Sequence, residues 1–353
     1  ENIWSYLSFI SVFLLLSFFL IDFHCFKASM KQIFTDGNNY TKLEIEKNRW
    51  TGRWWRMIAI IISVCSLTVF SVVQLFNEKN TPAHENESVE LDHTRLVDLG
   101  EQYLNKGDAE RAVSCFKKSA EFGNAEAQRL LGYCYFWGEG IREDTREAVK
   151  WYRLAAEQGD AEAQRNLGYC YFWGEGIRED KQEAVKWYRL AAGQGDASAQ
   201  WMLGGCYFFG NGIREDKQEA VKWYRLAAGQ GNAKAQWSLG GCYFFGEGIR
   251  EDKQEAVKWY RLAAEQGDAE AQRSLGDCYF FGNGVGKNKR EAVNWYFLSA
   301  KKGNAEAQRR LGACFYFGHG VAKNRQEAIR WYRLAAEQGN TVAISMLKKL
   351  GVM

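Results

Sequence analysis

A fixed period of 36 residues runs through most of the chain and constrains its fold more than any other feature. Six units start at equivalent residues, and a seventh that begins at Asn340 stops after one helix; the six starts are Asn124, Asp160, Asp196, Asn232, Asp268 and Asn304. A unit of this length cannot bury its apolar face alone, so neighbouring units must stack. The sequence therefore predicts an all-α, right-handed solenoid of about seven helical hairpins.

Local signals divide each unit into two helices. In the second unit, the first helix is expected to run from a capping Asp160 to about Trp173, followed by a glycine loop. The second helix opens with the capping-box pair Asp180 and Glu183, and Gly195 follows its end. The same Asp/Asn-x-x-Glu pair recurs in all six units, which supports the boundaries.

Small and large apolar residues alternate within each unit. The small residues that leave room for close helix approach are Ala163, Gly168, Ala184, Ala191 and Ala192. The larger residues expected to fill the core are Leu167, Tyr171, Trp187 and Leu190. Stacked neighbours are therefore predicted to form one continuous core.

The solenoid domain is predicted to cover residues 95–353. Residues 95–123 form a shorter, tetratricopeptide-type hairpin that lacks the glycine loop and is expected to cap the stack. The six 36-residue repeats occupy 124–339, and residues 340–353 add a C-terminal helix.

The unit pattern resembles Sel1-like repeats. The matching residues of the second unit are Ala163, Leu167, Gly168, Tyr171, Gly174, Gly176, Ile177, Ala184, Trp187, Tyr188, Ala191, Ala192 and Gly195. Departures are slight, since Val285 and Val321 replace the isoleucine and Phe315 replaces a repeat tyrosine. The resemblance implies a non-catalytic scaffold or adaptor, of the kind found in bacterial envelopes and in endoplasmic-reticulum quality control.

Two stretches have the length of membrane-spanning helices, which need about twenty apolar residues. The first lies within residues 1–26 and has no charge between Ile3 and Asp22, and the second covers residues 54–76. A cleaved signal peptide is the alternative for the first stretch, but no small-residue cleavage motif follows it. A two-helix transmembrane hairpin in a lipid bilayer is therefore expected.

The segments around the second stretch differ in charge. Residues 27–53 form a basic loop that either lies on an anionic membrane surface or forms a solvated connector. Residues 77–94 are polar and acidic, contain the only proline, Pro82, and are expected to be a linker.

Charge asymmetry predicts an orientation in the membrane. The basic loop belongs in the cytoplasm, which places the repeats on the other side, in the periplasm if the membrane is a bacterial inner membrane. The alternatives are repeats in the cytoplasm or in the lumen of a eukaryotic organelle. The sequence starts at Glu1 rather than Met, and a few lysines preceding it would reverse the orientation.

No residue pattern points to chemistry. The net charge of +3 does not suggest nucleic-acid binding, and the four histidines share no ligand spacing. Six of the nine cysteines recur at one repeat position, as Cys134, Cys170, Cys206, Cys242, Cys278 and Cys314. A metal or disulfide ladder is disfavoured, because packed helices lie about 10 Å apart and a disulfide needs Cα atoms within about 7 Å. We expect buried thiols, no enzyme activity, no metal or other cofactor, and no small-molecule substrate.

The units differ from one another mainly on one face of their first helices. The varying positions are 126, 129, 130, 133 and 137 and their equivalents, at helical offsets 0, 3, 4, 7 and 11. First helices line the concave side of such solenoids. The residues predicted to line a protein-binding groove are Arg129, Tyr133, Arg165, Asn166, Tyr169, Trp201, Met202, Trp237, Ser238, Arg273, Asp277 and Arg309.

Two interpretations of this variation stay open. In the first interpretation, these positions are solvent-exposed sites that tolerate substitution, and their residues differ by neutral sequence drift. Against it, tryptophan is unexpected at such sites, and Trp and Arg are typical of binding hot spots. The leading functional hypothesis is a membrane-anchored scaffold that binds partner proteins through the concave face of its solenoid. The alternative is a structural subunit of a multi-protein membrane complex, held mainly through its transmembrane helices.

Overall fold

The computed structural model describes residues 83–352 of the 353-residue chain, with side chains from His93 onward. Residues Glu87–Met353 form one compact unit, which is described here by itself. The expected spans 1–26 and 54–76 and the basic loop 27–53 lie outside the described residues. Between residues 83 and 352, no helix combines the length and the apolar character needed to cross a membrane.

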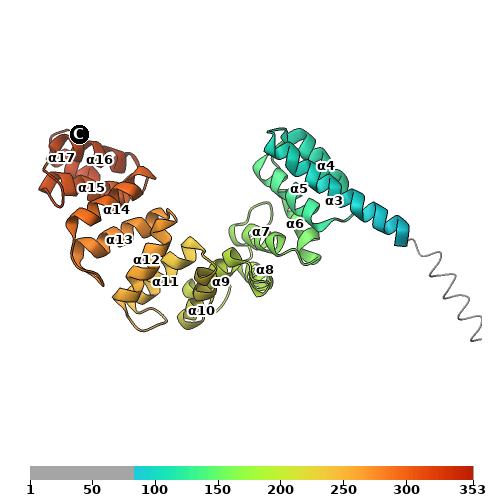
Figure 1. The fold of residues 1–353 in the computed structure, drawn as a ribbon, viewed down its shortest axis with the longest axis horizontal. Helices are drawn as coiled ribbons and strands as arrows, with labels where there is room; N and C mark the ends of the chain where they lie inside the picture. The colour runs from blue at the N-terminus through green and yellow to red at the C-terminus, as the bar shows by residue number, and fades with distance from the viewer. Residues whose placement is uncertain (1–82, 353) are drawn as a thin grey trace, which may run out of the picture. The chain divides into compact units, whose positions relative to one another are not determined.

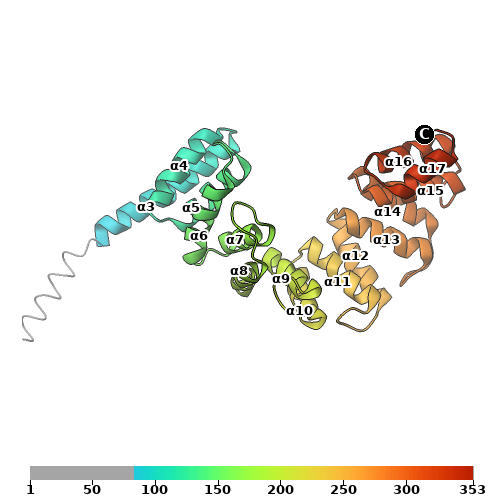
Figure 2. The same cartoon turned by 180° about the vertical axis from the view of Figure 1, so that it is seen from behind.

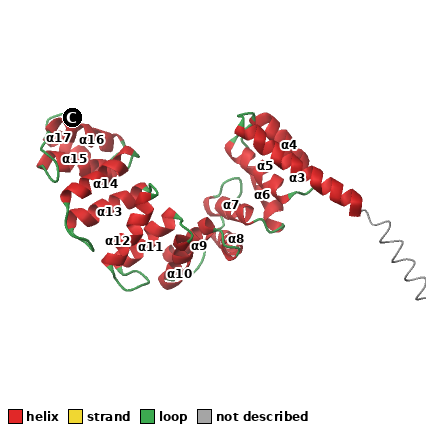
Figure 3. Cartoon of the chain, viewed as in Figure 1, coloured by secondary structure: helices red, strands yellow, loops and turns green. Residues whose placement is uncertain are grey.

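The described residues form fifteen α-helices and no strand, which confirms the predicted all-α solenoid (Figures 1 and 3). The helices are α3 (Ala83–Asn105), α4 (Ala109–Glu121), α5 (Ala125–Trp137), α6 (Thr145–Glu157), α7 (Ala161–Trp173), α8 (Lys181–Gly193), α9 (Ala197–Phe209), α10 (Lys217–Gly229), α11 (Ala233–Phe245), α12 (Lys253–Glu265), α13 (Ala269–Phe281), α14 (Lys289–Lys301), α15 (Ala305–Phe317), α16 (Arg325–Glu337) and α17 (Thr341–Lys349). We call α5, α7, α9, α11, α13 and α15 the first helices of their repeats, and α6, α8, α10, α12, α14 and α16 the second helices.

The start of α3 falls within the segment expected to be a linker. Residues 83–94 were expected to belong to a polar linker, but they form the first part of α3. No proline or glycine interrupts the sequence from Ala83 to Val97, and Pro82 directly precedes the helix, where a proline is tolerated. Polar composition alone did not indicate that this segment is helical.

From α4 to α17, each helix packs against the next one in the chain, and the hairpins follow one another in chain order in both views (Figures 1 and 2). The buried clusters cross the repeat boundaries. Tyr188 of α8 shares a cluster with Leu203 and Cys206 of α9, and Phe172 of α7 and Trp223 of α10 pack against its edge. A repeat therefore completes its core only with its neighbours, as the sequence predicted.

The helix caps form as expected, with one difference. The Asp180 carboxylate accepts hydrogen bonds from the Gln182 and Glu183 backbone N–H groups, which satisfies the first turn of α8. In a full capping box, the Glu183 side chain would accept from the Asp180 N–H. That N–H instead donates to the Tyr171 carbonyl at 2.8 Å, and Glu183 pairs with Lys186. The Asp180 N–H thus joins the two helices of one hairpin.

Glycine is required at two contacts that recur in the repeats. At Gly168, a Cβ atom would lie 2.7 Å from the Tyr188 ring, so glycine allows α7 and α8 to pack closely. Gly176 has a φ of 69°, and a Cβ atom there would lie 2.1 Å from the Thr145 carbonyl oxygen. The glycine loop of one repeat is thereby seated on the start of the second helix of the preceding repeat.

One predicted core residue is wrong. Leu190 is 52% exposed, whereas Ala184, Ala191 and Ala192 are fully or almost fully buried, as expected. Because Ala191 and Ala192 turn inward, the adjacent Leu190 points to solvent. The equivalent Leu226 is 53% exposed, so the outward position belongs to the repeat itself.

A row of glutamines joins the two ends of each repeat and also reaches the preceding repeat through a buried hydrogen bond. Gln164 donates from Nε2 to the Ala156 carbonyl and accepts at Oε1 from Gln194 Nε2, at 2.8 Å. The same pairing joins Gln128 to Gln158, Gln200 to Gln230, Gln236 to Gln266 and Gln308 to Gln338. Lys302 stands where the partner of Gln272 would be, and Gln272 Oε1 has no partner among the described residues.

Candidate functional site

The four arginines of the predicted groove already have acidic partners within the solenoid. Arg129 reaches Asp160 and Glu162 of the next repeat, at 3.4 and 3.0 Å. Arg165 contacts Asp196 of the next repeat at 2.8 Å. Arg273 pairs with Glu270 and Asp277, and Arg309 pairs with Glu306. Binding of acidic groups on a partner by these arginines would therefore compete with existing ion pairs.

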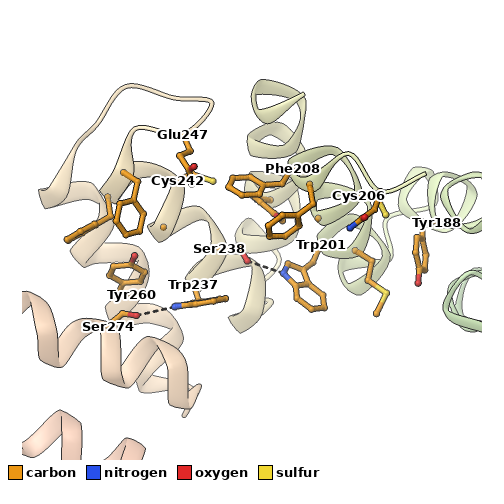
Figure 4. Close-up of a pocket in the computed structure, with 18 of the residues that line it drawn as sticks. Tyr188, Trp201, Cys206, Phe208, Trp237, Ser238, Cys242, Glu247, Tyr260 and Ser274 are labelled. Carbon is orange, nitrogen blue, oxygen red and sulfur yellow. Dashed lines mark hydrogen bonds between the residues drawn. The ribbon is translucent and has the colours of Figure 1, made fainter. Parts of the chain in front are cut away.

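The two tryptophans occupy the same position as these arginines and also reach the next repeat. The Trp201 indole Nε1–H donates to the Ser238 hydroxyl at 3.1 Å, and the Trp237 indole donates to Ser274 at 3.2 Å (Figure 4). The Lys234 ammonium lies over the Trp201 ring, 5.0 Å from its centroid. Both rings are half-buried against the core, so their orientation is fixed by neighbouring groups.

A hollow of about 570 Å³ extends along this face, mainly across α9 and α11. Trp201, Met202, Trp237, Ser238, Arg273 and Asp277 line it, which brings together half of the predicted residues. The other predicted residues, Arg129, Tyr133, Arg165, Asn166, Tyr169 and Arg309, are not part of its lining. Much of the remaining wall is aromatic, and the polar side chains of Asn211 and Glu247 also line the hollow. The aromatic residues are Phe172, Trp173, Phe208, Phe209, Phe244 and Phe245.

The hollow exists because of a change at one repeat position. Tyr133 and Tyr169 hold this position in the first two repeats, where their side chains are 44% and 36% exposed. Gly205 and Gly241 replace them in the next two repeats. A Cβ atom at either glycine would meet only a tyrosine hydroxyl, at 3.8 Å, so the space above both glycines is open.

Two tyrosine hydroxyls lie at the floor of the hollow. They belong to Tyr224 and Tyr260 of the second helices, whose rings are almost fully buried. Neither hydroxyl forms a hydrogen bond with any of the described residues. In the following repeat, the equivalent Tyr296 hydroxyl donates to Asp277 at 2.6 Å. An aspartate in place of the glycine thus satisfies the hydroxyl and closes the hollow at that end.

Asp277 is held by several groups at once. Its carboxylate accepts the hydrogen bond from Tyr296 and also forms ion pairs with Arg273 at 3.1 Å and with Arg310 at 3.0 Å. Burial nevertheless raises the pKa of the Asp277 carboxyl above its usual range. This network is internal to the solenoid, and it forms a polar end wall beside an apolar hollow.

The residues predicted to line the groove did not include the aromatic wall, although its outer rings lie at position 137 and its equivalents on the varying face. Phe209 and Phe245, at the ends of α9 and α11, are 68% and 67% exposed, and Trp173 at the end of α7 is 60% exposed. The signal was present in the sequence, because this position is aromatic in all six repeats. Phe208 and Phe244 pack edge-on against these exposed rings. Gly205 and Gly241 lie at equivalents of the varying position 133, but they have no side chain and were not among the residues predicted to line the groove.

The recurring cysteines are not arranged as a chemical site. All six lie free and almost completely buried, and burial raises the pKa of Cys206, for example, from 9.0 to about 12. Within the described part of the chain, no cluster of three or more His, Cys, Asp or Glu residues could hold a metal ion. Protonated, buried thiols act here as small apolar core residues.

Stacked helical hairpins with an apolar hollow on the first-helix face define an α-solenoid of the repeat-protein class. The Sel1 repeat model matches residues 98–124, 125–160, 161–196, 197–232, 233–268, 269–304 and 305–340. The chain therefore belongs to the Sel1 repeat family, with seven repeats. The first of the seven matches, residues 98–124, corresponds to the hairpin 95–123 that was expected to be a tetratricopeptide-type cap.

Two solved structures are similar over most of the solenoid. A protective antigen present in uropathogenic Escherichia coli strains, which displays an SLR fold, is 38% identical with a TM-score of 0.64. The match covers 73% of this chain and 56% of the antigen, so it spans little more than half of that protein. A Sel1 repeat protein from Oxalobacter formigenes is 37% identical with a TM-score of 0.64, over 68% of this chain and 96% of its own. No curated protein matches the sequence.

Proposed function

We propose that the chain is a membrane-anchored scaffold that binds a partner protein through the first-helix face of its solenoid. Sel1 repeat proteins are generally non-enzymatic and typically mediate protein–protein interaction. The observation that supports a site on this chain is the hollow between Trp173 and Asp277, with tryptophans held in place by Ser238 and Ser274. Rigid aromatic side chains lose little entropy on binding, which suits an interface hot spot.

The membrane anchor is proposed from the sequence alone. Residues 1–26 and 54–76 are apolar enough to span a bilayer, and the basic loop between them favours repeats in the periplasm of a bacterial inner membrane. Extraction of native membranes at pH 11 should leave the chain in the pellet. Protease added outside spheroplasts should then degrade the repeats. Release at pH 11 would contradict the anchor, and protection of the repeats would contradict the orientation.

Site-specific photo-crosslinking tests the binding face. A benzophenone amino acid replaces Phe245, which lines the hollow and is 67% exposed, or Leu226, which is 53% exposed and does not line it. Both sites tolerate a bulky aromatic group because both side chains reach solvent. A discrete crosslinked protein at position 245 and none at position 226 is expected. Equal crosslinking at both positions would contradict the proposal.

The second candidate is a structural subunit of a membrane complex that is held through the two apolar stretches. It is favoured by their length and by the internal pairing of the groove arginines, which leaves these side chains less free for a partner. Replacement of residues 1–76 by an unrelated two-helix hairpin distinguishes the two functions. Retained crosslinking from position 245 supports the scaffold. Loss of stoichiometric co-purification in detergent supports the structural subunit.

A further inference from the structure

A lysine opens four of the second helices, and in three of them an acidic residue of a glycine loop pairs with it. Lys181 pairs with Glu179 of its own repeat at 3.3 Å, and the lysine that opens α12 has the same kind of partner. Lys217 pairs with Glu247 of the following glycine loop at 2.9 Å. Lys289 opens α14 in the same way, but it has no acidic partner among the described residues.

Bases replace both residues that would pair with Lys289. Lys287 stands where the acidic residue of the same loop would be, and His319 stands where the acidic residue of the following loop would be. A third base, Lys323, occupies the position of Lys287 in that following loop. Neither Lys287 nor Lys323 forms an ion pair with any described residue. Four basic side chains thus gather at a place where the other repeats balance their charges.

The reversal of charge extends to the loops and helix caps of these two repeats. The four preceding glycine loops are net acidic, whereas loops 282–288 and 318–324 are net basic. Aspartate caps the four preceding second helices, but the neutral Asn288 and Asn324 cap α14 and α16. The start of a helix favours negative charge, and here the cap no longer supplies it. This end of the solenoid therefore lacks the anions that the other repeats contain.

Packing brings the two basic loops together. The second of them is seated on the start of α14, where a Cβ atom on Gly320 would clash with the Lys289 carbonyl oxygen. The His319 imidazole stacks on the Phe317 ring, with centroids 5.7 Å apart, and meets the Phe280 ring edge-on at 5.6 Å. The Lys289 ammonium lies over the same Phe280 ring, 5.5 Å from its centroid. Aromatic rings therefore hold the two half-buried bases side by side.

The ionisation of His319 reflects this crowding of positive charge. Burial and the ammonium groups of Lys289, Lys287 and Lys323 lower the pKa of the imidazole below its usual range. A bound anion would raise that pKa again, because nearby negative charge favours the imidazolium form. His319 would thereby become a fourth cation of the site, and its pKa reports whether an anion is bound.

We propose that Lys287, Lys289, His319 and Lys323 bind a phosphate group where loops 282–288 and 318–324 meet. A phosphate monoester carries a charge of about −1.5 to −2 at neutral pH and three acceptor oxygens, so it can contact several ammonium groups at once. A carboxylate offers a single charge to the same groups. Soluble phosphate esters and phospholipid headgroups share this chemistry. None of the four side chains lines the hollow, so this site is separate from the proposed partner-binding face.

The other repeats supply the substitutions for the test. Lys287→Glu and His319→Glu each give Lys289 a partner that equivalent lysines already have, so the fold accepts them. Lys117→Glu is the matched control, because it makes the same change of charge as Lys287→Glu at an exposed site in α4. The melting temperature of each variant, measured by circular dichroism, verifies that it is folded.

Isothermal titration calorimetry of the full chain in a zwitterionic detergent measures the affinity. The probes are inorganic phosphate and dihexanoylphosphatidic acid, with dihexanoylphosphatidylcholine as the lipid control. We expect saturable binding of phosphate that Lys287→Glu and His319→Glu each weaken about tenfold or more and that Lys117→Glu leaves unchanged. Phosphatidic acid that binds at least about tenfold more tightly than phosphate identifies a lipid headgroup as the source. Similar or weaker binding of phosphatidic acid identifies a soluble phosphate.

Nuclear magnetic resonance of carbon-13-labelled histidines locates the bound anion. Phosphate should raise the pKa of His319 more than sodium chloride does at the same ionic strength. His319→Gln assigns the resonance. Equal shifts with phosphate and chloride would overturn the inference, and so would native affinity in both glutamate variants of the site or an equal loss in Lys117→Glu. Binding of the phosphatidylcholine control as tight as that of phosphatidic acid would also overturn it. Crosslinking from position 245 tests the proposed function independently.

Discussion

The Trp201 indole donates a hydrogen bond to the Ser238 hydroxyl at 3.1 Å, from one repeat to the next. Trp237 and Ser274 repeat this contact one unit further along. At the same position, Arg129 and Arg165 form ion pairs with acidic residues of the next repeat. From α5 to α11, the residue at this position therefore connects neighbouring repeats, and in α9 and α11 it also forms the wall of a hollow.

Removal of the serine hydroxyl should loosen this connection without creating a large cavity. Ser238→Ala leaves the Trp201 ring in place but deprives its N–H of a partner, so we expect the free energy of unfolding to fall by about 1 kcal/mol. Urea denaturation followed by circular dichroism measures the change. Ser114→Ala is the control, because the Ser114 hydroxyl only bonds a carbonyl of its own helix. Equal stability of the Ser238 and Ser114 variants would contradict the role given to this hydrogen bond.

Lys302→Gln should stabilise the solenoid. Gln272 Oε1 is buried without a partner among the described residues, and glutamine at the position of Lys302 supplies that hydrogen bond in the other pairs, such as Gln164 and Gln194. We expect a gain of about 1 kcal/mol, measured by urea denaturation. Lys117→Gln, at an exposed site, controls for the loss of a positive charge. A stability gain as large in the control would show that charge, not the buried hydrogen bond, is responsible.

Gly176→Ala should destabilise the stack by more than about 2 kcal/mol. The left-handed φ of 69° is strained for alanine, and the added Cβ would lie 2.1 Å from the Thr145 carbonyl oxygen. Gly193→Ala is the matched control, since it lies in α8 with nothing within 4 Å and should be neutral or slightly stabilising. Thermal unfolding compares the two. The prediction fails if Gly176→Ala melts at the native temperature.

The buried thiols predict a pH dependence of stability. Burial raises the pKa of Cys170 and Cys206 from 9.0 to about 12. Because the folded pKa lies above the unfolded value, this contribution to stability is complete below about pH 9 and is lost as the pH rises toward 12. The urea midpoint should therefore be insensitive to the repeat thiols between pH 6 and 8 and should fall above pH 9.

Thiol labelling checks the same burial directly. At pH 8.5, a maleimide or disulfide reagent should modify the partly exposed Cys115 of the native chain before any of the six repeat cysteines. Addition of denaturant should expose all of them, and mass spectrometry of the peptides identifies each site. Rapid native labelling of Cys206 would show that the core opens more readily than its burial indicates.

Much of the fold could be predicted because each local signal acts within a few residues. The caps at Asp160 and Asp180 and the glycine after each second helix set the boundaries, and the structure places them as expected. Leu190 could not be placed from the pattern, because an apolar residue beside two inward alanines fits the core or the surface equally well. The sequence pattern also predicted that the Glu183 side chain would accept a hydrogen bond from the Asp180 N–H. That N–H donates to the Tyr171 carbonyl instead, and a local pattern could not show this because Tyr171 belongs to another helix.

The site was predictable only in part. The variable face contained Trp201 and Trp237, and the structure places both in one hollow. It also shows that the groove arginines are paired within the stack, and sequence variation alone could not distinguish such contacts from contacts with a partner. Gly205 and Gly241 carry no side chain, so their meaning depends on the distance to the Tyr224 and Tyr260 hydroxyls of other helices.

The sequence by itself determined the repeat length, the two helices of each unit, their caps and the family, because these depend on hydrogen bonds and packing preferences that recur every 36 residues. Only the tertiary structure decided which side chains of one repeat meet those of the next. It thereby decided where Trp201 is held by Ser238, where Gln272 is left without a partner, and where two glycines open a hollow. These contacts join residues about one repeat apart across a helix interface, and their geometry follows from how the stacked helices pack rather than from any local pattern.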